Sequence, residues 1–368
     1  MEHVNVGVIG CGNISAHYLK TLRAFPLLNV AACADQDLAR ARACAEQYGL
    51  ARACTVEEML ADPAISLVVN LTVPNAHAAV THAALRAGKH VHSEKPLCLT
   101  RGEARQLLEA AQARQVRLGC APDTFLGGGM QTCRKLIDDG WIGEPVGASA
   151  FLMNHGHEHW HPDPAFYYKA GGGPMFDMGP YYLTSLVSLL GPIRRVTGAA
   201  RTTFPERVIT SQPRAGTRVS VDVPTFVAGT LEFAGGAIAS LITTFDVWAS
   251  QLPHLEIYGT EGSLALPDPN WFRGPVRLRR RDSADWSEVP LTHGFTADHF
   301  RGLGAVDLAY AVRSGRPHRA SAEMAAHVVE AMSGFLDSAA AGRAYDLVSR
   351  CDRPAALPMG LPEDRMDD

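Results

Sequence analysis

The chain has 368 residues, of which 46% are hydrophobic and 20% charged, and its formal net charge is −4. This length suggests about two domains, and the composition is that of a globular protein. No apolar run reaches the ~18 residues that span a bilayer, and no block of Lys and Arg stands out. We therefore expect neither a membrane nor a nucleic acid as a partner. The N-terminus has no basic region and runs straight into a strand pattern, which is not typical of a secretory signal, so we expect the protein in the cytoplasm.

The first 120 residues alternate short apolar runs with helical patterns. Continuous apolar runs separated by helices are typical of parallel strands that are covered on both faces. The sequence thus predicts a doubly wound α/β domain. Its strands are expected at 4–10, 28–35, 66–73, 89–93 and 116–121, and its helices at 15–25, 36–49, 77–88 and 100–115.

After about residue 145 the pattern changes to runs that are typical of antiparallel strands joined by tight turns. These runs lie at 146–154, 225–234, 236–245, 254–259 and 262–266, and helical patterns follow near 297–314 and 321–341. We predict a Rossmann domain over 1–122 and an α+β domain with an open, mainly antiparallel sheet over 123–345. The tail, 346–368, is rich in Pro and charge, which suggests disorder in its last dozen residues.

A glycine-containing turn follows the first predicted strand. Gly10 and Gly12 lie between that strand and a helix, where a tight turn and the helix N-terminus suit a pyrophosphate. The third position of G-x-G-x-x-G is Ser15 rather than Gly. Asp35 ends the second strand and is placed to accept the ribose hydroxyls of NAD, whereas it would repel the 2′-phosphate of NADP. We predict an NAD site that includes Asn13 and Ile14; a phosphate-binding or empty turn is the alternative.

Two further loops follow the third and fourth strands, at the sheet edge where such folds bind ligands. One has the sequence TVPNAHAA (72–79) and the other SEKPL (93–97). Pro96 favours an extended conformation for the residue before it. The cofactor contacts expected from these loops are Thr72, Pro74, Asn75, His77, Glu94 and Lys95.

The stretch GGGPMFDMGPYYL (171–183) combines apolar residues with three glycines, two prolines and one carboxylate, Asp177. Pro180 removes a backbone donor, so we expect a helix that is kinked or that starts late. Asp177 and Tyr181 would then face the same side if the helix includes both.

These motifs resemble the glucose–fructose oxidoreductase/inositol dehydrogenase (Gfo/Idh/MocA) family over about residues 3–345. The resemblance rests on the G-x-G turn, Pro74-Asn75 with His77, Glu94-Lys95-Pro96 and the glycine-rich stretch that contains Asp177. It implies a Rossmann domain followed by an open sheet, one face of which covers the nicotinamide. That sheet often joins subunits, so we expect a homodimer or homotetramer.

The resemblance also implies a catalytic group made of Lys95, Asp177 and a histidine four residues after the aspartate. Here Tyr181 occupies the histidine position. We predict Lys95, Asp177 and Tyr181 as catalytic, with Gly171–Gly173 allowing a close approach to the nicotinamide. Lys95 could take the proton if burial beside other cations lowers its pKa. The alternatives are an ion pair of Lys95 with a carboxylate such as Glu94, and a packing role for Tyr181.

Four histidines, at 155, 157, 159 and 161, alternate with period two, so on a strand all would face one side. A metal site is one interpretation. We favour a wall of a sugar pocket and predict no metal. The substrate-binding residues predicted are Lys95, His157, Trp160, His161, Tyr168, Asp177 and Tyr181.

The eight cysteines include no Cys-x-x-Cys pair and are expected to be reduced and mostly buried.

These features predict an NAD-dependent oxidoreductase that acts on a secondary hydroxyl or ketone of a sugar, glycoside or cyclitol. The alternative is a non-redox glycosidase or lyase of the same fold, in which bound NAD transiently oxidises the sugar before elimination. A non-catalytic NAD-binding regulator is disfavoured by Glu94-Lys95-Pro96 together with Asp177.

Overall fold

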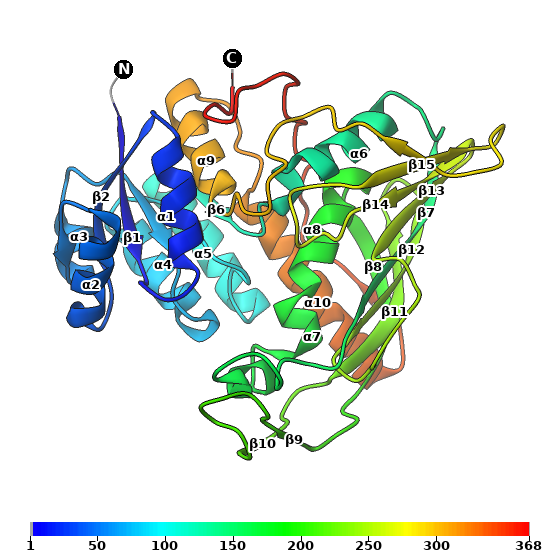
Figure 1. The fold of residues 1–368 in the computed structure, drawn as a ribbon, viewed down its shortest axis with the longest axis horizontal. Helices are drawn as coiled ribbons and strands as arrows, with labels where there is room; N and C mark the ends of the chain where they lie inside the picture. Colours follow the sequence, from blue (N-terminus) through cyan, green and yellow to red (C-terminus); the bar gives the residue numbers. More distant parts are fainter. Residues whose placement is uncertain (1–2, 368) are drawn as a thin grey trace.

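The first third of the chain forms a sheet of six parallel strands, in the order β3-β2-β1-β4-β5-β6 (Figure 1). The computed structural model describes residues 3–367. The order reverses between β2 and β4, so the carboxyl ends of the strands flank a crevice beside β1. The strands are β1 (Val4–Ile9), β2 (Leu28–Ala34), β3 (Ala53–Cys54), β4 (Leu67–Asn70), β5 (His90–Ser93) and β6 (Leu118–Cys120).

Helices connect these strands, as the periodicity predicted. Two of them begin with reciprocal capping boxes, in which Thr55 pairs with Glu58 and Thr100 with Glu103. The helices are α1 (Ser15–Ala24), α2 (Leu38–Tyr48), α3 (Val56–Ala61), α4 (His77–Arg86) and α5 (Arg101–Arg114), with the 3₁₀ turn η1 (Pro74–Ala76) before α4.

A second sheet of nine strands follows, in the order β16-β15-β14-β13-β7-β12-β11-β8-β17. Within this sheet, β7 and β12 are the one parallel pair among the described strands, so the sheet is mainly antiparallel and the predicted fold class is confirmed. Its strands are β7 (Pro145–Met153), β8 (Ile193–Arg201), β11 (Phe226–Phe233), β12 (Ile238–Thr244), β13 (Leu255–Gly259), β14 (Gly262–Leu266), β15 (Val276–Arg280), β16 (Ser287–Val289) and β17 (Tyr345–Asp346). A separate hairpin pairs β9 (Glu206–Val208) with β10 (Arg218–Ser220).

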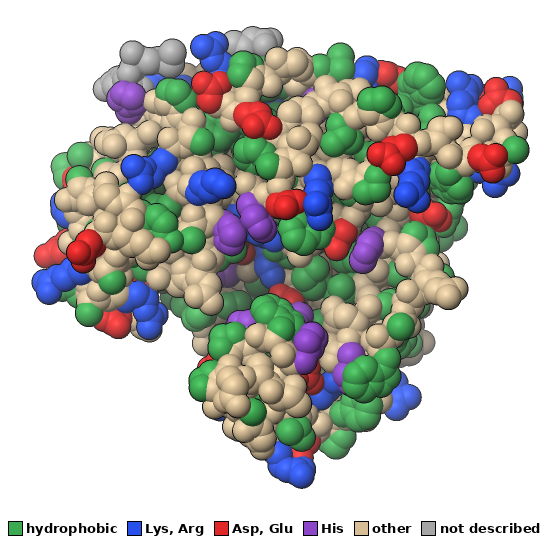
Figure 2. Space-filling model, in the orientation of Figure 1, with side chains coloured by type: hydrophobic (Ala, Val, Ile, Leu, Met, Phe, Trp, Pro, Cys, Tyr) green, Lys and Arg blue, Asp and Glu red, His purple; other side chains and the backbone are tan. Residues whose placement is uncertain are grey.

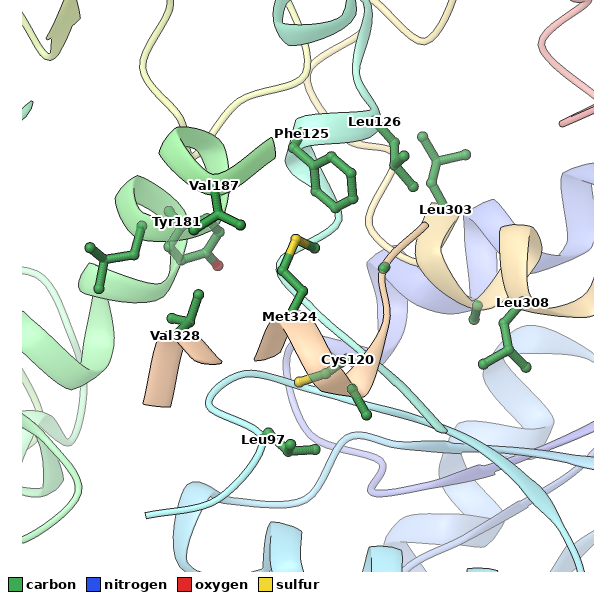
Figure 3. Packing of buried hydrophobic residues seen from close by; sticks show 14 of the residues in the cluster. Leu97, Cys120, Phe125, Leu126, Tyr181, Val187, Leu303, Leu308, Met324 and Val328 are labelled. Atoms are coloured by element: carbon green, nitrogen blue, oxygen red, sulfur yellow. The ribbon is translucent and has the colours of Figure 1, made fainter. Parts of the chain in front are cut away.

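Helices join the two sheets into one body. The long α10 (Ala322–Ala341) contacts β8 and β11 of the second sheet and also α5 and β6 of the first, while α9 (Leu303–Ser314) packs beside α1. Figure 3 shows the shared core, where Cys120 and Leu97 of the first domain lie below Met324 of α10, and Tyr181 of α8 (Gly179–Leu190) lies above Val328 of α10. The remaining helical segments are α6 (Gly128–Asp138), α7 (Gly173–Asp177), η2 (Thr124–Leu126) and η3 (Pro164–Tyr168).

Three expectations differ from the structure. The helix predicted near 297 begins at Leu303, because Gly302 has a φ of 109° and interrupts it. In the tail, whose last dozen residues were expected to be disordered, Leu357 and Met366 are buried, whereas residues 362–365 between them are exposed. The four-histidine segment is not a strand: β7 ends at Met153, and Gly156 has a φ of 88°. In residues 3–367 no helix has both the length and the apolar character needed to cross a bilayer.

Candidate functional site

The glycine turn after β1 leaves room above it. Gly10 has a φ of 102°, and a Cβ there would lie 2.6 Å from the backbone of Leu71, so only glycine fits. A Cβ on Gly12 would meet nothing within 4 Å. Asn13 is exposed and Ile14 partly exposed, and neither backbone amide has a hydrogen-bond partner among the described residues. The turn therefore offers free amides beside open space at the start of α1, which fits a pyrophosphate.

Asp35 is fixed at the end of β2. Its Oδ2 accepts a hydrogen bond from the Cys11 amide at 2.9 Å and its Oδ1 accepts one from the Asp37 amide at 3.0 Å. The Arg40 guanidinium lies 3.8 Å from the same carboxylate. The carboxylate thus bridges the glycine turn and the start of α2, where it can accept from ribose hydroxyls.

The loops after β4 and β5 are tied together by His77. This residue is only 1% exposed, and its Nδ1 and Nε2 lie 2.6 Å from the Pro96 carbonyl oxygen and 2.8 Å from that of Thr72. Burial lowers the pKa of His77. Both ring nitrogens face backbone carbonyl oxygens, so in this geometry His77 positions the loop that carries Pro74 and exposed Asn75, while its direct contact with the cofactor stays a prediction.

Glu94 also has an internal role. It is 8% exposed; its Oε1 accepts from the hydroxyl of fully buried Tyr18 at 2.7 Å, and its Oε2 accepts from the Lys95 amide at 2.9 Å. Glu94 was expected to contact the cofactor or to pair with the Lys95 ammonium. Instead it orients the backbone from which Lys95 projects.

Lys95, Asp177 and His157 form one group. The Lys95 Nζ donates to Asp177 Oδ1 at 2.9 Å and to the Asp177 backbone oxygen at 2.7 Å. His157 Nε2 lies 3.2 Å from the other carboxylate oxygen, Oδ2. The three side chains are 15, 14 and 10% exposed, so they are largely desolvated and still reachable. The histidine thus reaches Asp177 from the loop after β7 rather than from position 181.

The charges in this group differ from the expectation for Lys95. Burial disfavours its ammonium form, but Asp177, Tyr181 and Glu94 outweigh burial and raise the pKa of Lys95 above its usual value. Burial likewise disfavours the Asp177 carboxylate, but Lys95 and His157 outweigh burial and hold the pKa of Asp177 below its usual range. Lys95 is therefore an ammonium ion in this arrangement, and the lowered pKa considered from the sequence is not found.

Tyr181 lies between two cations. Its ring centroid is 5.1 Å from Lys95 Nζ and 5.4 Å from the Arg301 guanidinium. Its hydroxyl accepts from Arg301 Nη1 at 3.0 Å, while Arg301 Nη2 donates to Asn270 at 2.7 Å. Burial raises the pKa of Tyr181, although Lys95 and Arg301 oppose this, so the hydroxyl keeps a proton to donate. Arg301 was missed from the sequence because it lies in a loop before α9 with no motif around it.

The glycine-rich stretch behaves partly as predicted. The helix α7 ends at Asp177, and α8 starts anew at Gly179 with Pro180 in its first turn, which confirms the expected interruption. A Cβ on Gly172 would lie 2.6 Å from the carbonyl oxygens of Phe166 and Tyr167. The close approach that requires glycine is thus to the neighbouring η3 turn.

The histidine-rich segment divides into separate environments. His155 stacks on Trp248 with ring centroids 3.5 Å apart, and His159 is exposed. Trp160 is 56% exposed and lies between His157 and His161. Its ring centroid is 5.3 Å from that of each histidine. The histidines therefore do not share a face.

Tyr168 does not line the site. It was predicted as a substrate contact, but it is 0% exposed and packs on Phe245 and under Arg207, so no part of its side chain is open to a substrate in this geometry. Figure 2 shows a hollow between the two lobes of the molecule, with histidine side chains around it.

A doubly wound domain with a phosphate-binding turn, next to a lysine–aspartate–histidine group, defines a dinucleotide-dependent oxidoreductase. Family models agree: residues 4–121 match "Oxidoreductase family, NAD-binding Rossmann fold" and residues 130–265 match "GFO/IDH/MocA C-terminal domain". The chain belongs to the GFO/IDH/MocA family of oxidoreductases.

Named relatives are dehydrogenases and reductases. The 1,5-anhydro-D-fructose reductase of Ensifer adhaerens is 28% identical over 256 residues, which are 68% of this chain and 72% of the relative. The D-xylose dehydrogenase of Paenarthrobacter nicotinovorans is 26% identical over 339 residues, 84% of each chain. Among solved structures, levoglucosan dehydrogenase in its apo form superposes with a TM-score of 0.82 at 23% identity and covers 95% of this chain and 100% of its own. A complex of that enzyme with NADH and L-sorbose has a TM-score of 0.81 at 22% identity, with coverage of 95% and 100%.

Proposed function

We propose that this protein is an NAD-dependent oxidoreductase for a secondary hydroxyl or ketone of a sugar-like molecule. The observation that carries the proposal is the group of Lys95, Asp177 and His157 beside a turn that fits a dinucleotide. Relatives named for anhydrofructose, xylose and levoglucosan support the substrate class.

The dinucleotide would be held by the free amides of Asn13 and Ile14, by Asp35 and by the loop of Thr72, Pro74 and Asn75. When bound, it supplies or accepts the hydride. Asp35 supports NAD over NADP, because a carboxylate accepts from the 2′-hydroxyl and repels a phosphate.

Lys95 is the proposed proton donor to the carbonyl oxygen in the reduction direction. As an ammonium ion it can place one proton on that oxygen while Asp177 holds the other two through its carboxylate and carbonyl. In the oxidation direction Lys95 must first lose a proton, and a positive charge near it would lower its pKa. Tyr181 is proposed to keep its proton and to donate a hydrogen bond from its hydroxyl to the same substrate oxygen, while Arg301 donates a hydrogen bond to the Tyr181 oxygen.

His157 is proposed to serve the function of the histidine that the family resemblance places at position 181. Its ring contacts Asp177 and lies 4.0 Å, centroid to centroid, from Tyr167. Trp160 and His161 extend the same wall and are proposed as substrate contacts.

The test is a panel of sugars, polyols and ketoses assayed with NAD or NADH, with wild type compared with Lys95→Ala. The proposal requires stoichiometric conversion of the cofactor with at least one member. Lys95→Ala is expected to bind NAD normally and to lose turnover, while Lys135→Ala on the surface of α6 changes little. A fall in activity of less than about tenfold, which is ~1.4 kcal/mol of barrier, would remove Lys95 from the acid–base role. Product formed without net cofactor conversion would instead indicate the elimination chemistry.

A further inference from the structure

Three cysteines that are far apart in sequence meet behind the glycine turn. Cys11 lies in the turn between β1 and α1, Cys33 lies on β2 and Cys44 lies on α2. Their Sγ atoms all lie within 4.8 Å of one another. Cys33 and Cys44 are buried, and Cys11 is partly exposed as a residue although the cluster of three thiols is itself buried.

The spacing suits a single soft metal ion. A metal–sulfur bond of about 2.3 Å places three sulfurs around a planar centre about 4.0 Å apart, so a contraction of less than about 1 Å completes the geometry. Thiolates select Cu⁺ and Zn²⁺ among the biological metals. In the part of the chain that the structure describes, no imidazole or carboxylate joins the three thiols as a fourth ligand.

The thiols have only weak partners to give up. Cys11 Sγ lies 3.6 Å from the Ala34 carbonyl oxygen and Cys33 Sγ lies 3.3 Å from that of Ala41. Thiols are weak donors, so coordination would replace contacts of little strength. The other cysteines in residues 3–367 lie outside this cluster.

We propose that Cys11, Cys33 and Cys44 form a binding site for one thiophilic d¹⁰ cation, Cu⁺ or Zn²⁺. Binding exchanges three S–H protons for three metal–sulfur bonds and involves no oxidation. Planar three-sulfur coordination favours Cu⁺. Zn²⁺, which is almost always four-coordinate in structural sites, would need a water as its fourth ligand. The site does not depend on the proposed enzymatic activity, because it is defined by the thiols alone.

The experiment is a titration of the reduced, metal-free full-length protein with Cu⁺ against a competing chelator, under anaerobic conditions, with Zn²⁺ in a parallel arm. Wild type is expected to bind one ion per chain, with three sulfur neighbours in X-ray absorption. Cys44→Ala should weaken that binding at least 100-fold. Cys98→Ala, which removes a buried thiol outside the cluster, should not change it.

Because Cys44 is buried, Cys11→Ala at the partly exposed position provides a second variant whose folding is at less risk. Circular dichroism of each variant checks the fold. Equal affinity in wild type and in both folded cluster variants, or no binding of either ion by wild type, would overturn the site. One Zn²⁺ bound with three sulfurs and one oxygen supports the site with the zinc geometry, and one Cu⁺ with three sulfurs supports it with the copper geometry.

Discussion

Lys95 is held twice by Asp177, through the carboxylate Oδ1 at 2.9 Å and through the backbone oxygen at 2.7 Å. The carboxylate raises the pKa of the lysine against the opposing effect of burial, and the lysine lowers the pKa of the carboxyl against its own burial. The two charges support each other most fully between the ordinary pKa values of the two groups, 3.8 and 10.5. This support weakens as acid protonates Asp177 and as alkali deprotonates Lys95.

Asp177→Asn should therefore shift the pH profile of carbonyl reduction. Without the carboxylate, the Lys95 ammonium loses its proton at lower pH, so the alkaline fall of kcat/KM should move to lower pH. The measurement is kcat/KM for NADH-dependent reduction across the alkaline range in both proteins. Asp222→Asn, which alters the partner of exposed Lys169, serves as the control and should leave the profile in place. An alkaline limb that does not move in Asp177→Asn would show that Lys95 is not the titrating group.

His157→Asn should lower kcat/KM by roughly 10- to 100-fold, because it removes the ring that contacts Asp177 Oδ2. His159→Asn changes an exposed neighbour on the same segment and should stay close to wild type. Steady-state kinetics with the best substrate of the panel provides the comparison. Equal activity of the two variants would show that His157 does not serve the function of the histidine that the family resemblance places at position 181.

The sequence predicted the parts of the site that depend on local pattern. Alternating apolar runs and helices predicted the parallel sheet, and Pro180 predicted the break between α7 and α8. The approach of His157 to Asp177 was not predicted, because it depends on how a loop folds after β7. Arg301 was missed for the same reason, since its contact with Tyr181 joins residues 120 positions apart.

The burial of individual side chains was the other property that the sequence pattern could not predict. His77 and Tyr168 were predicted as ligand contacts, yet both are almost fully buried and serve the protein interior. The three-thiol cluster was also not predicted from the sequence. Residues 11, 33 and 44 do not have the spacing of a metal-binding motif, and they meet only when β1, β2 and α2 pack together.

NAD should bind more tightly than NADP. Asp35→Ser should reduce the difference in affinity between NAD and NADP. It should do so mainly by weakening NAD binding about tenfold, because a charged hydrogen-bond partner of the ribose is lost. Arg40→Ala is the informative companion, because its guanidinium lies 3.8 Å from Asp35 and could otherwise pair with a 2′-phosphate. We expect Arg40→Ala to leave NAD affinity within about twofold in a fluorescence titration. Equal affinity of wild type for the two dinucleotides would reject the assignment to Asp35.

The protein should form a homodimer or homotetramer through the outer face of the nine-stranded sheet. On this face Ala199, Ala228, Ile242 and Phe151 form a cross-strand row of small and apolar residues, as the pairing register shows. Such a flat row suits a second sheet. Ile242→Glu should raise the dissociation constant of the oligomer at least tenfold by light scattering, whereas Val348→Glu, at an 82% exposed position outside this row and beyond the end of the edge strand β17, should not. Monomeric wild type at micromolar concentration would contradict this assembly.

Tyr181 and Arg301 should act as one unit. Tyr181→Phe keeps the ring between the two cations and removes only the hydroxyl, so we expect a loss of roughly 10²-fold in kcat/KM with little change in stability. Arg301→Lys keeps the charge but cannot donate to Tyr181 and Asn270 at once, and it should cause part of the same loss.

The double variant of Tyr181 and Arg301 then shows whether the two residues lower kcat/KM through one shared effect or through two separate effects. If the arginine acts by holding the tyrosine hydroxyl, Tyr181→Phe with Arg301→Lys should be little worse than Tyr181→Phe alone, which is strong non-additivity. Tyr182→Phe is the matched control, because that ring is 0% exposed and its hydroxyl lies 3.3 Å from the Phe151 carbonyl oxygen, away from Lys95. Tyr181→His should retain more activity than Tyr181→Phe, since it restores the residue that the family resemblance places there. Full activity of Tyr181→Phe on the true substrate would assign Tyr181 to packing and leave Lys95 with Asp177 and His157 as the groups that handle the proton.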